Sequence, residues 1–257
     1  MEEKRRLVTR SDFDGLVCAM LLRELNLIDE IKFVHPKDVQ DGKVELTAND
    51  ITTNLPYDPR VGLAFDHHES EVDRLKATET NGKLIIDPTA RSAARVVYDY
   101  YGGAKVLKRI SPELMEAVDK GDSADFTLDE ILHPTGWVLL HYLMDARTGL
   151  GRFHDFRISN YQLMMELIDF CLEHSIDEIL ELPDVKESDI ESAVDYLVSL
   201  PYVDKDRIGG LGICGSGSYM SVAGVKEPRI KAVTAIVPAI SDISRSEERR
   251  VGKECRS

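Results

Sequence analysis

The fold is decided by residues 5–25, which read RRLVTRSDFDGLVCAMLLREL. Residues 5–9 begin an extended apolar run, a Ser-Asp-x-Asp-Gly turn follows, and residues 16–25 are apolar on nearly every side. A helix that is apolar all round is buried in the protein interior. The stretch therefore predicts a strand, a tight turn and a buried helix.

The next eighty residues repeat this alternation of strand and helix. Short apolar or β-branched runs bounded by Pro, Gly, Asn and Asp are typical of strands in a covered parallel sheet. Such runs lie at residues 31–34, 44–47, 61–65 and 84–86, and residues 90–101 form a helical pattern that ends at two glycines. We therefore predict an α/β fold, an open and mostly parallel sheet with helices on both faces and functional groups at the carboxyl ends of the strands.

A helical segment follows this α/β pattern, from residue 111 to about residue 182. Its clearest helical periods lie at residues 113–118, 136–144 and 161–174. They are interrupted by residues 147–157, RTGLGRFHDFR, which contain three arginines and a histidine. This tract is either a solvated connector or a contact for an anionic substrate.

After Pro183 the sequence changes in style. A helix is expected at residues 190–199, a strand at 207–213, a Gly-rich turn and a short helix next, and a strand at 230–237. Residues 245–257 are mostly charged or small and cannot build a packed face. We predict three parts: a domain with a helical extension over residues 1–182, a second unit over residues 188–240 and a disordered tail over residues 241–257.

The overall charge limits the partners of the protein. The chain has 257 residues, of which 43% are hydrophobic, and its 32 Lys and Arg against 46 Asp and Glu give a net charge of −14. This composition is that of a globular protein, and such a surface repels long duplex nucleic acid and anionic membranes. A phosphate-containing substrate must therefore be held locally, by a metal or by a small basic pocket.

Two further features bear on the compartment. The densest apolar run near the start, residues 16–22, is too short for a signal peptide or a membrane span. The four cysteines, Cys18, Cys171, Cys214 and Cys255, show no Cys-x-x-Cys spacing, which argues against a disulfide framework or a thiolate zinc site. We expect a cytoplasmic protein.

Acidic and histidine side chains cluster where the predicted strands end. The candidates are Asp12 and Asp14 after the first strand, Asp50 after residues 44–47, Asp66-His67-His68 after residues 61–65, and Asp119, Asp122 and Asp125 in the helical segment. An Asp-x-Asp-Gly sequence or a single Asp is also common in ordinary turns. Two imidazoles directly after a carboxylate have little use in packing, so the third set points most strongly to a site.

Carboxylates and neutral imidazoles together are ligands for Mn²⁺, Zn²⁺ or Fe²⁺. A shared carboxylate can hold two such ions ~3.5 to 4 Å apart, the spacing used in phosphoester hydrolysis. Bound ions lower the pKa of water from ~15.7 toward ~7 and neutralise phosphoryl oxygens. The pattern therefore predicts a metal-dependent hydrolase that acts on phosphate esters.

Residues 9–15, TRSDFDG, together with Asp50 and Asp66-His67-His68, resemble the DHH phosphoesterase family, over about residues 5–182. This family includes exopolyphosphatase-like proteins, oligoribonucleases and cyclic-dinucleotide phosphodiesterases. The resemblance implies one or two divalent ions, Mn²⁺ by preference or else Mg²⁺ or Co²⁺. It implies as ligands Asp12, Asp14, Asp50, Asp66, His67 and Asp119. Asp122 is the rival of Asp119, and His68 is either a ligand or a phosphate contact.

The sequence departs from this family in two places. Many relatives have His where this chain has Arg10, and a guanidinium cannot coordinate a metal because it stays protonated. Either one ion binds more weakly, or Arg10 grips a substrate phosphate directly, which would place it in the active site beside Asp66 and His68. The chain also has no Gly-Gly-Gly-His motif, with which the substrate-binding domain of relatives usually ends.

A second resemblance covers residues 188–240, which are similar to an α/β-hydrolase of the dienelactone hydrolase type. Residues 212–217, GICGSG, place Cys214 where such enzymes carry their nucleophile. The family order requires a later histidine, but the last one is His174, so we expect this segment to be inactive. Because the two resemblances meet near Lys186, and residues 245–257 resemble translated sequencing adapter, we hypothesise a chimeric reading frame.

The sequence thus favours a metal-dependent phosphohydrolase that cleaves a phosphoanhydride or phosphodiester bond. The expected substrate is a phosphate-containing small molecule or a short oligonucleotide. One alternative is a remnant that binds metal or nucleotide without turnover. Another, ranked last, is an esterase that acts through Cys214. The sequence does not indicate whether the protein is a monomer or an oligomer.

Overall fold

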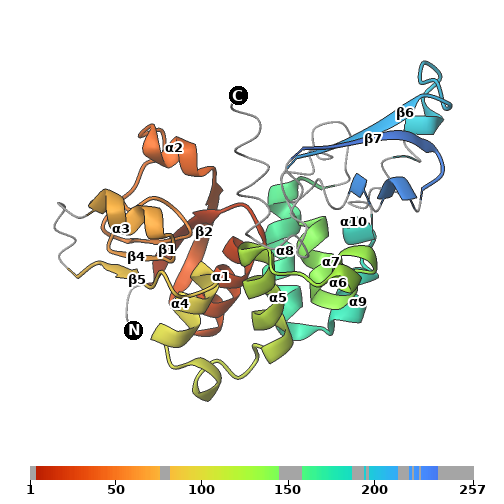
Figure 1. Ribbon diagram of the computed structural model, residues 1–257. Helices are drawn as coiled ribbons and strands as arrows, with labels where there is room; N and C mark the ends of the chain where they lie inside the picture. Colours follow the sequence, from red (N-terminus) through yellow and green to blue (C-terminus); the bar gives the residue numbers. More distant parts are fainter. Residues whose placement is uncertain are drawn as a thin grey trace. The chain divides into compact units, whose positions relative to one another are not determined.

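The computed structural model describes residues 4–75, 82–144, 158–186, 194, 197–213, 220–221, 223–225 and 227–236. The chain divides into two compact units (Figure 1). The first contains residues 1–123 and 156–185, and the second contains residues 124–155 and 186–257. The predicted first domain thus loses residues 124–155 to the second unit, and the predicted tail lies outside the described residues.

A five-stranded parallel sheet forms the centre of the first unit, as the sequence predicts. Its strands are β1 (Arg5–Arg10), β2 (Ile28–Val34), β3 (Asp50–Thr53), β4 (Leu63–Asp66) and β5 (Leu84–Ile86). They lie in the order β2-β1-β3-β4-β5, and every neighbouring pair is parallel. The strand order reverses between β1 and β3, and ligands of open α/β sheets bind beyond the carboxyl ends of the strands at such a point.

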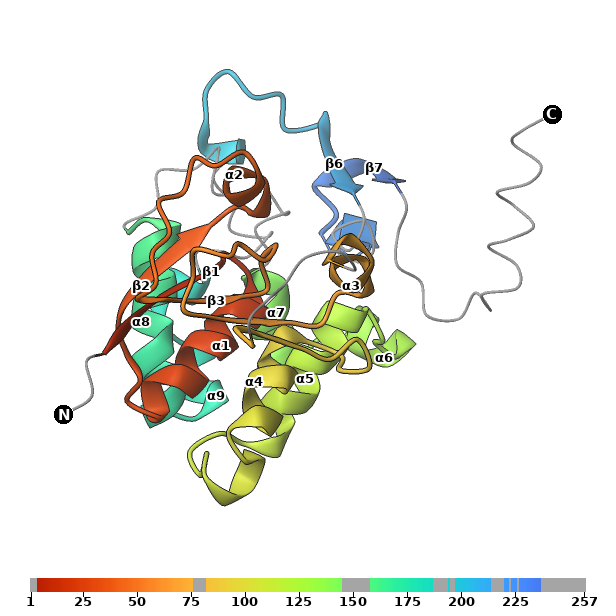
Figure 2. The ribbon, with the colours of Figure 1, turned by 90° about the vertical axis from the view of Figure 1, so that its left-hand side faces the viewer.

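Long helices cover one face of this sheet. They are α1 (Phe13–Glu24), α4 (Ala93–Tyr100), α5 (Pro112–Ser123) and α8 (Asn160–Glu173). Helix α1 contacts the other three and lies between α8 and α4 (Figure 2). Every residue from Phe13 to Leu22 is buried, which confirms the predicted buried helix and explains its lack of a polar face. The 3₁₀ turn η1 (Gly103–Lys105) follows α4, and α9 (Ile176–Leu180) and α10 (Pro183–Lys186) follow α8.

The other face is covered by α2 (Pro36–Gln40), α3 (Glu69–Leu75) and the loops beside them (Figure 1). Val44 and Leu46 are buried there against Val8 and Ala64 of the sheet. The prediction of a strand at residues 44–47 is therefore wrong, because these apolar side chains belong to a loop that covers the sheet. The strand is β3, six residues later.

The described part of the second unit contains α6 (Leu128–Leu132), α7 (Gly136–Leu143) and the parallel pair β6 (Ile208–Ile213) and β7 (Ile230–Ile236). Both strands agree with the predicted ranges. The tract at residues 147–157 and the turn with Cys214 lie outside the described residues, as does most of the helix predicted at residues 190–199. No helix of the described residues is long and apolar enough to cross a membrane.

Candidate metal centre

The turn between β1 and α1 places two carboxylates at the carboxyl edge of the sheet. Asp12 caps α1, because its Oδ1 accepts a hydrogen bond from the Gly15 amide at 2.9 Å. Gly15 is required at this point, since a Cβ there would lie 1.9 Å from the carbonyl oxygen of Arg10. Asp14 follows in the first turn of the helix and is buried.

Asp14 is held by the first turn of another helix. Its carboxylate accepts hydrogen bonds from the backbone amides of Ala93 and Ala94, at 3.1 and 2.8 Å, at the start of α4. The amide donors and the dipole at a helix N-terminus stabilise a negative charge. This contact therefore positions the buried carboxylate and offsets part of the cost of burying it.

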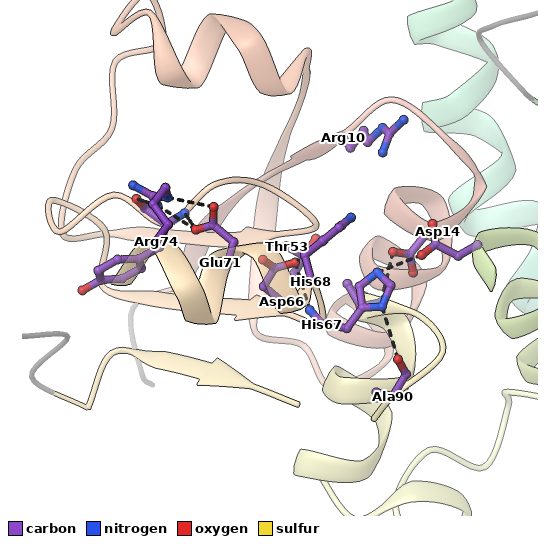
Figure 3. Close-up of polar contacts among 12 residues, drawn as sticks. Arg10, Asp14, Thr53, Asp66, His67, His68, Glu71, Arg74 and Ala90 are labelled. Carbon is purple, nitrogen blue, oxygen red and sulfur yellow. Dashed lines mark hydrogen bonds and ion pairs between the residues drawn. The ribbon is translucent and has the colours of Figure 1, made fainter. Parts of the chain in front are cut away.

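The Asp66-His67-His68 motif extends from the end of β4 (Figure 3). The Oδ1 atom of buried Asp66 accepts from the His67 amide at 2.9 Å and from His68 Nδ1 at 2.8 Å. The Nδ1 atom of His67 lies 3.3 Å from the carbonyl oxygen of Ala90. A carbonyl partner requires a proton on Nδ1, which leaves Nε2 to face the site, as is usual for metal-binding histidines.

Three of these groups converge. The Nε2 atom of His67 lies 2.8 Å from Asp122 Oδ2, and candidate ligand atoms of Asp14, His67 and Asp122 all lie within 4.8 Å of one another. We call this group the metal-site cluster. Its members come from α1, from the loop after β4 and from α5. Two carboxylates and an imidazole can together hold a divalent cation.

The charges of the cluster favour a cation. Burial, and then the charges of Asp122 and Asp12, raise the pKa of Asp14 well above its usual value, against the effect of its amide donors. Burial acts to lower the pKa of His67, but the hydrogen bond to Asp122 and the charge of that carboxylate raise it overall. For Asp122 burial acts to raise the pKa, and His67 lowers it overall. A divalent cation would relieve the repulsion between the two carboxylates.

Two neighbouring side chains support the fit to a metal. Asp66 Oδ2 and both polar atoms of the Asn54 side chain are buried and have no hydrogen-bond partner among the described residues. Buried polar atoms without partners are rare and costly. The donor set and the two unsatisfied oxygen atoms, Asp66 Oδ2 and Asn54 Oδ1, together fit a site for a divalent ion.

The predicted ligands are thus brought together only in part. Asp14 and His67 belong to the metal-site cluster. Asp12 caps the helix that carries Asp14, and Asp66 ends β4 directly before His67. Of the two candidates in α5, Asp122 belongs to the cluster, whereas the carboxylate of Asp119 is bound by Arg95 and Ser92. His68 lies next to His67, with ring centroids 4.5 Å apart, and its side chain is 43% exposed.

Asp50 is not brought to this edge. The prediction that Asp50 follows a strand is wrong, because Asp50 begins β3 and pairs in register with Arg6 near the start of β1. Its carboxylate binds Arg6 Nε at 2.8 Å and Arg6 Nη2 at 2.9 Å, and it accepts from the Thr47 amide at 2.6 Å. Asp50 therefore lies at the amino end of the sheet, opposite the cluster.

Asn54 is a candidate that sequence reasoning missed. It follows β3 at the carboxyl edge, is 2% exposed and has a positive φ of 53°. Its backbone N–H donates to the carbonyl oxygen of Phe65 at 3.2 Å, which places Asn54 beside the end of β4. Asn adopts a positive φ more readily than most residues, so it is common where a strand ends in a turn. The sequence would have pointed to Asn54 only if the strand had been placed correctly, directly before it.

Comparison with known proteins shows the family of the chain. The chain is 48% identical to PggH from Vibrio cholerae, a pGpG-specific phosphodiesterase of known structure. The similarity covers 89% of this chain and 76% of that one, with a TM-score of 0.66. The chain belongs to the phosphodiesterase family of PggH. Membership makes it a phosphoesterase, and it agrees with the predicted α/β fold and with the resemblance to DHH phosphoesterases.

Other comparisons add less. No family model matches the chain. It is 42% identical over 57 residues to the uncharacterized protein YcjY of Escherichia coli, and 43% identical over 51 residues to the uncharacterized protein PA2218 of Pseudomonas aeruginosa. The chain spans only 19% and 14% of these two proteins. The similarity to PggH gives no support to a junction between unrelated halves, and the α/β-hydrolase segment stays a prediction.

Proposed function

We propose that this member of the PggH family is a metal-dependent phosphodiesterase that cleaves a small linear dinucleotide such as pGpG. The observation that carries the proposal is the metal-site cluster, in which a buried carboxylate, an imidazole and a second carboxylate converge at the carboxyl edge of the sheet. The phosphodiesterase activity of PggH supports the reaction class.

The cluster would hold a divalent cation through Asp14, His67 and Asp122. Asp12, Asp66 and Asn54 are the candidates for a second ion, because they end or follow the neighbouring strands. We favour Mn²⁺, with Mg²⁺ and Co²⁺ as alternatives. A bound cation supplies a water of lowered pKa and neutralises charge on the phosphoryl oxygens.

The protein's own groups have separate tasks. Asp66 orients His68, whose ring is partly exposed, so His68 can contact the phosphoryl group or protonate the leaving oxygen. The hydrogen bond to Asp66 is the main cause that raises the pKa of His68, against the effect of burial. The Ala90 carbonyl holds His67 in the tautomer that would leave Nε2 free to bind a cation.

Arg10 is proposed as a substrate contact. It ends β1 in the place of the family's histidine, and its Nε lies 2.8 Å from Asp12 Oδ2. About a third of its side chain is exposed, so the guanidinium can reach a phosphate while Asp12 orients it. A positive group at this edge would attract an anionic substrate locally, although the chain as a whole, with its net charge of −14, repels it.

The proposal is tested by assays on metal-stripped protein supplied in turn with Mn²⁺, Mg²⁺ and Co²⁺. The substrates are pGpG, pyrophosphate, polyphosphate and a simple carboxylic ester. We expect conversion of pGpG to GMP that requires a cation and stops on addition of EDTA. Cation binding without hydrolysis of any substrate would instead support the binding remnant, and cation-independent ester hydrolysis would support Cys214.

Arg10→Ala is expected to raise KM for pGpG by roughly 10- to 100-fold, with a smaller change in kcat. The reason is that a hydrogen bond to a charged group contributes about 1.5–3 kcal/mol, which corresponds to that factor. Steady-state kinetics measure it. The matched control is Arg60→Ala, since Arg60 is exposed and also pairs with an aspartate two residues away, and it should leave KM unchanged. An equal KM in both variants would contradict the assignment.

A further inference from the structure

The carboxylate of Asp119 has its donors in another helix. Asp119 lies in α5, one helical turn before Asp122, and is 6% exposed. Its Oδ1 accepts from Ser92 Oγ at 2.8 Å, and its Oδ2 accepts from Arg95 Nε at 2.9 Å and from Arg95 Nη2 at 2.6 Å. All of these donors belong to the start of α4. Both oxygens of this carboxylate are thus turned to α4, where they hold its N-terminus.

The start of α4 in turn holds two members of the metal-site cluster. Ser92 is the N-cap, with its Oγ accepting from the Arg95 amide at 3.0 Å. The next two amides donate to Asp14, and the carbonyl of Ala90 accepts from His67. Residues 90–95 therefore form one segment that binds the carboxylate of Asp119 and that also hydrogen-bonds to Asp14 and His67.

The same segment is tied to the end of α5 that carries Asp122. Ser123 Oγ donates to the backbone carbonyl of Asp119 at 2.6 Å. The Nη2 atom of Arg91 donates to Ser123 Oγ at 3.1 Å. Helix α5 is thus hydrogen-bonded to residues 90–95 both through Asp119, one turn before Asp122, and through Ser123, directly after Asp122.

We propose that Asp119 is a positioning residue that sets the distances within the metal-site cluster by joining α5 to residues 90–95. This inference rests on the proposed metal-dependent function. Loss of the join would let the start of α4 shift relative to α5, and with it the separation of Asp14 and Asp122. Groups that orient metal ligands in this way typically change metal affinity by 10- to 100-fold when they are removed.

The test compares Asp119→Asn with Asp50→Asn. Both aspartates are buried, and both bind one arginine through two nitrogens, but Asp50 lies at the amino end of the sheet. We expect both variants to have a lower Tm. Only Asp119→Asn should weaken Mn²⁺ binding, by roughly 10- to 100-fold in Kd, as measured by titration calorimetry on metal-stripped protein. An unchanged Kd, or an equal loss in both variants, would overturn the inference.

Ser92→Ala separates positioning from direct ligation and serves if Asp119→Asn does not fold. It removes the cap and one bond to Asp119 but keeps both the carboxylate and Arg95. A positioning role predicts weaker Mn²⁺ binding in Ser92→Ala, whereas ligation by Asp119 predicts an unchanged Kd, which would overturn the inference. Failure of the unmodified protein to bind Mn²⁺, Mg²⁺ or Co²⁺ would instead overturn the proposed function.

Discussion

Asp122→Asn is expected to lower kcat/KM for pGpG by at least about 1,000-fold, well beyond the 10- to 100-fold effect of losing an outer partner of a metal ligand. Asp122 Oδ2 lies 2.8 Å from His67 Nε2, within the metal-site cluster. An amide has no negative charge to bind a divalent cation, and it cannot form an ion pair with His67. Initial rates of pGpG hydrolysis at saturating Mn²⁺ measure the loss.

The matched control is Asp125→Asn, three residues further along and exposed. It should keep kcat/KM within about twofold, because substitutions of exposed residues usually change little. Thermal melting in EDTA completes the test. Loss of Asp122 removes the repulsion between two carboxylates, so the metal-free variant should melt no more than slightly below the unmodified protein. Retention of more than a tenth of the activity in Asp122→Asn would contradict the assigned role.

Much of the fold could be predicted because its signals are local. Helix α1 has no polar face, and a helix buried on every side needs none. The short run at residues 84–86 is a strand as predicted. The prediction of the third strand was wrong because the buried apolar residues in this region are not the residues that form the strand. Val44 and Leu46 are buried in a loop, whereas β3 begins with a charged residue and contains two threonines.

The site could be predicted only where the chain itself brings the ligands to an edge. His67 directly follows β4, and Asp14 lies in the first turn of α1, four residues after β1 ends. Asp119 and Asp122 lie one turn apart on the same helix, so spacing and chemistry do not distinguish them. What distinguishes them is Arg95, 24 residues before Asp119, which occupies one carboxylate and leaves the other to the cluster. Such a long-range pair leaves no local signal in the sequence.

Asp50→Asn is expected to lower the free energy of unfolding by about 3 kcal/mol at pH 7 while leaving Mn²⁺ binding unchanged. Breaking a buried ion pair typically costs about 3–5 kcal/mol, and the lower value applies because the Arg6 side chain is 20% exposed and can recover hydration. Urea unfolding of both proteins, followed by far-UV circular dichroism, measures the difference. The control is Asp58→Asn, whose partner Arg60 is 50% exposed, so the loss should stay below about 1 kcal/mol.

The difference in unfolding free energy between the unmodified protein and Asp50→Asn should become smaller at low pH. Burial acts to raise the pKa of Asp50, but the bonds from Arg6 and Thr47 lower it overall in the folded protein. A carboxyl group with a lowered folded pKa stabilises the fold above its unfolded pKa of about 3.9, and this contribution is lost as the pH falls through the folded value. The gap between the unmodified protein and Asp50→Asn should therefore be constant above about pH 5 and shrink below pH 4. A gap that grows on acidification would contradict the lowered pKa of Asp50, and weaker Mn²⁺ binding would place Asp50 in the site after all.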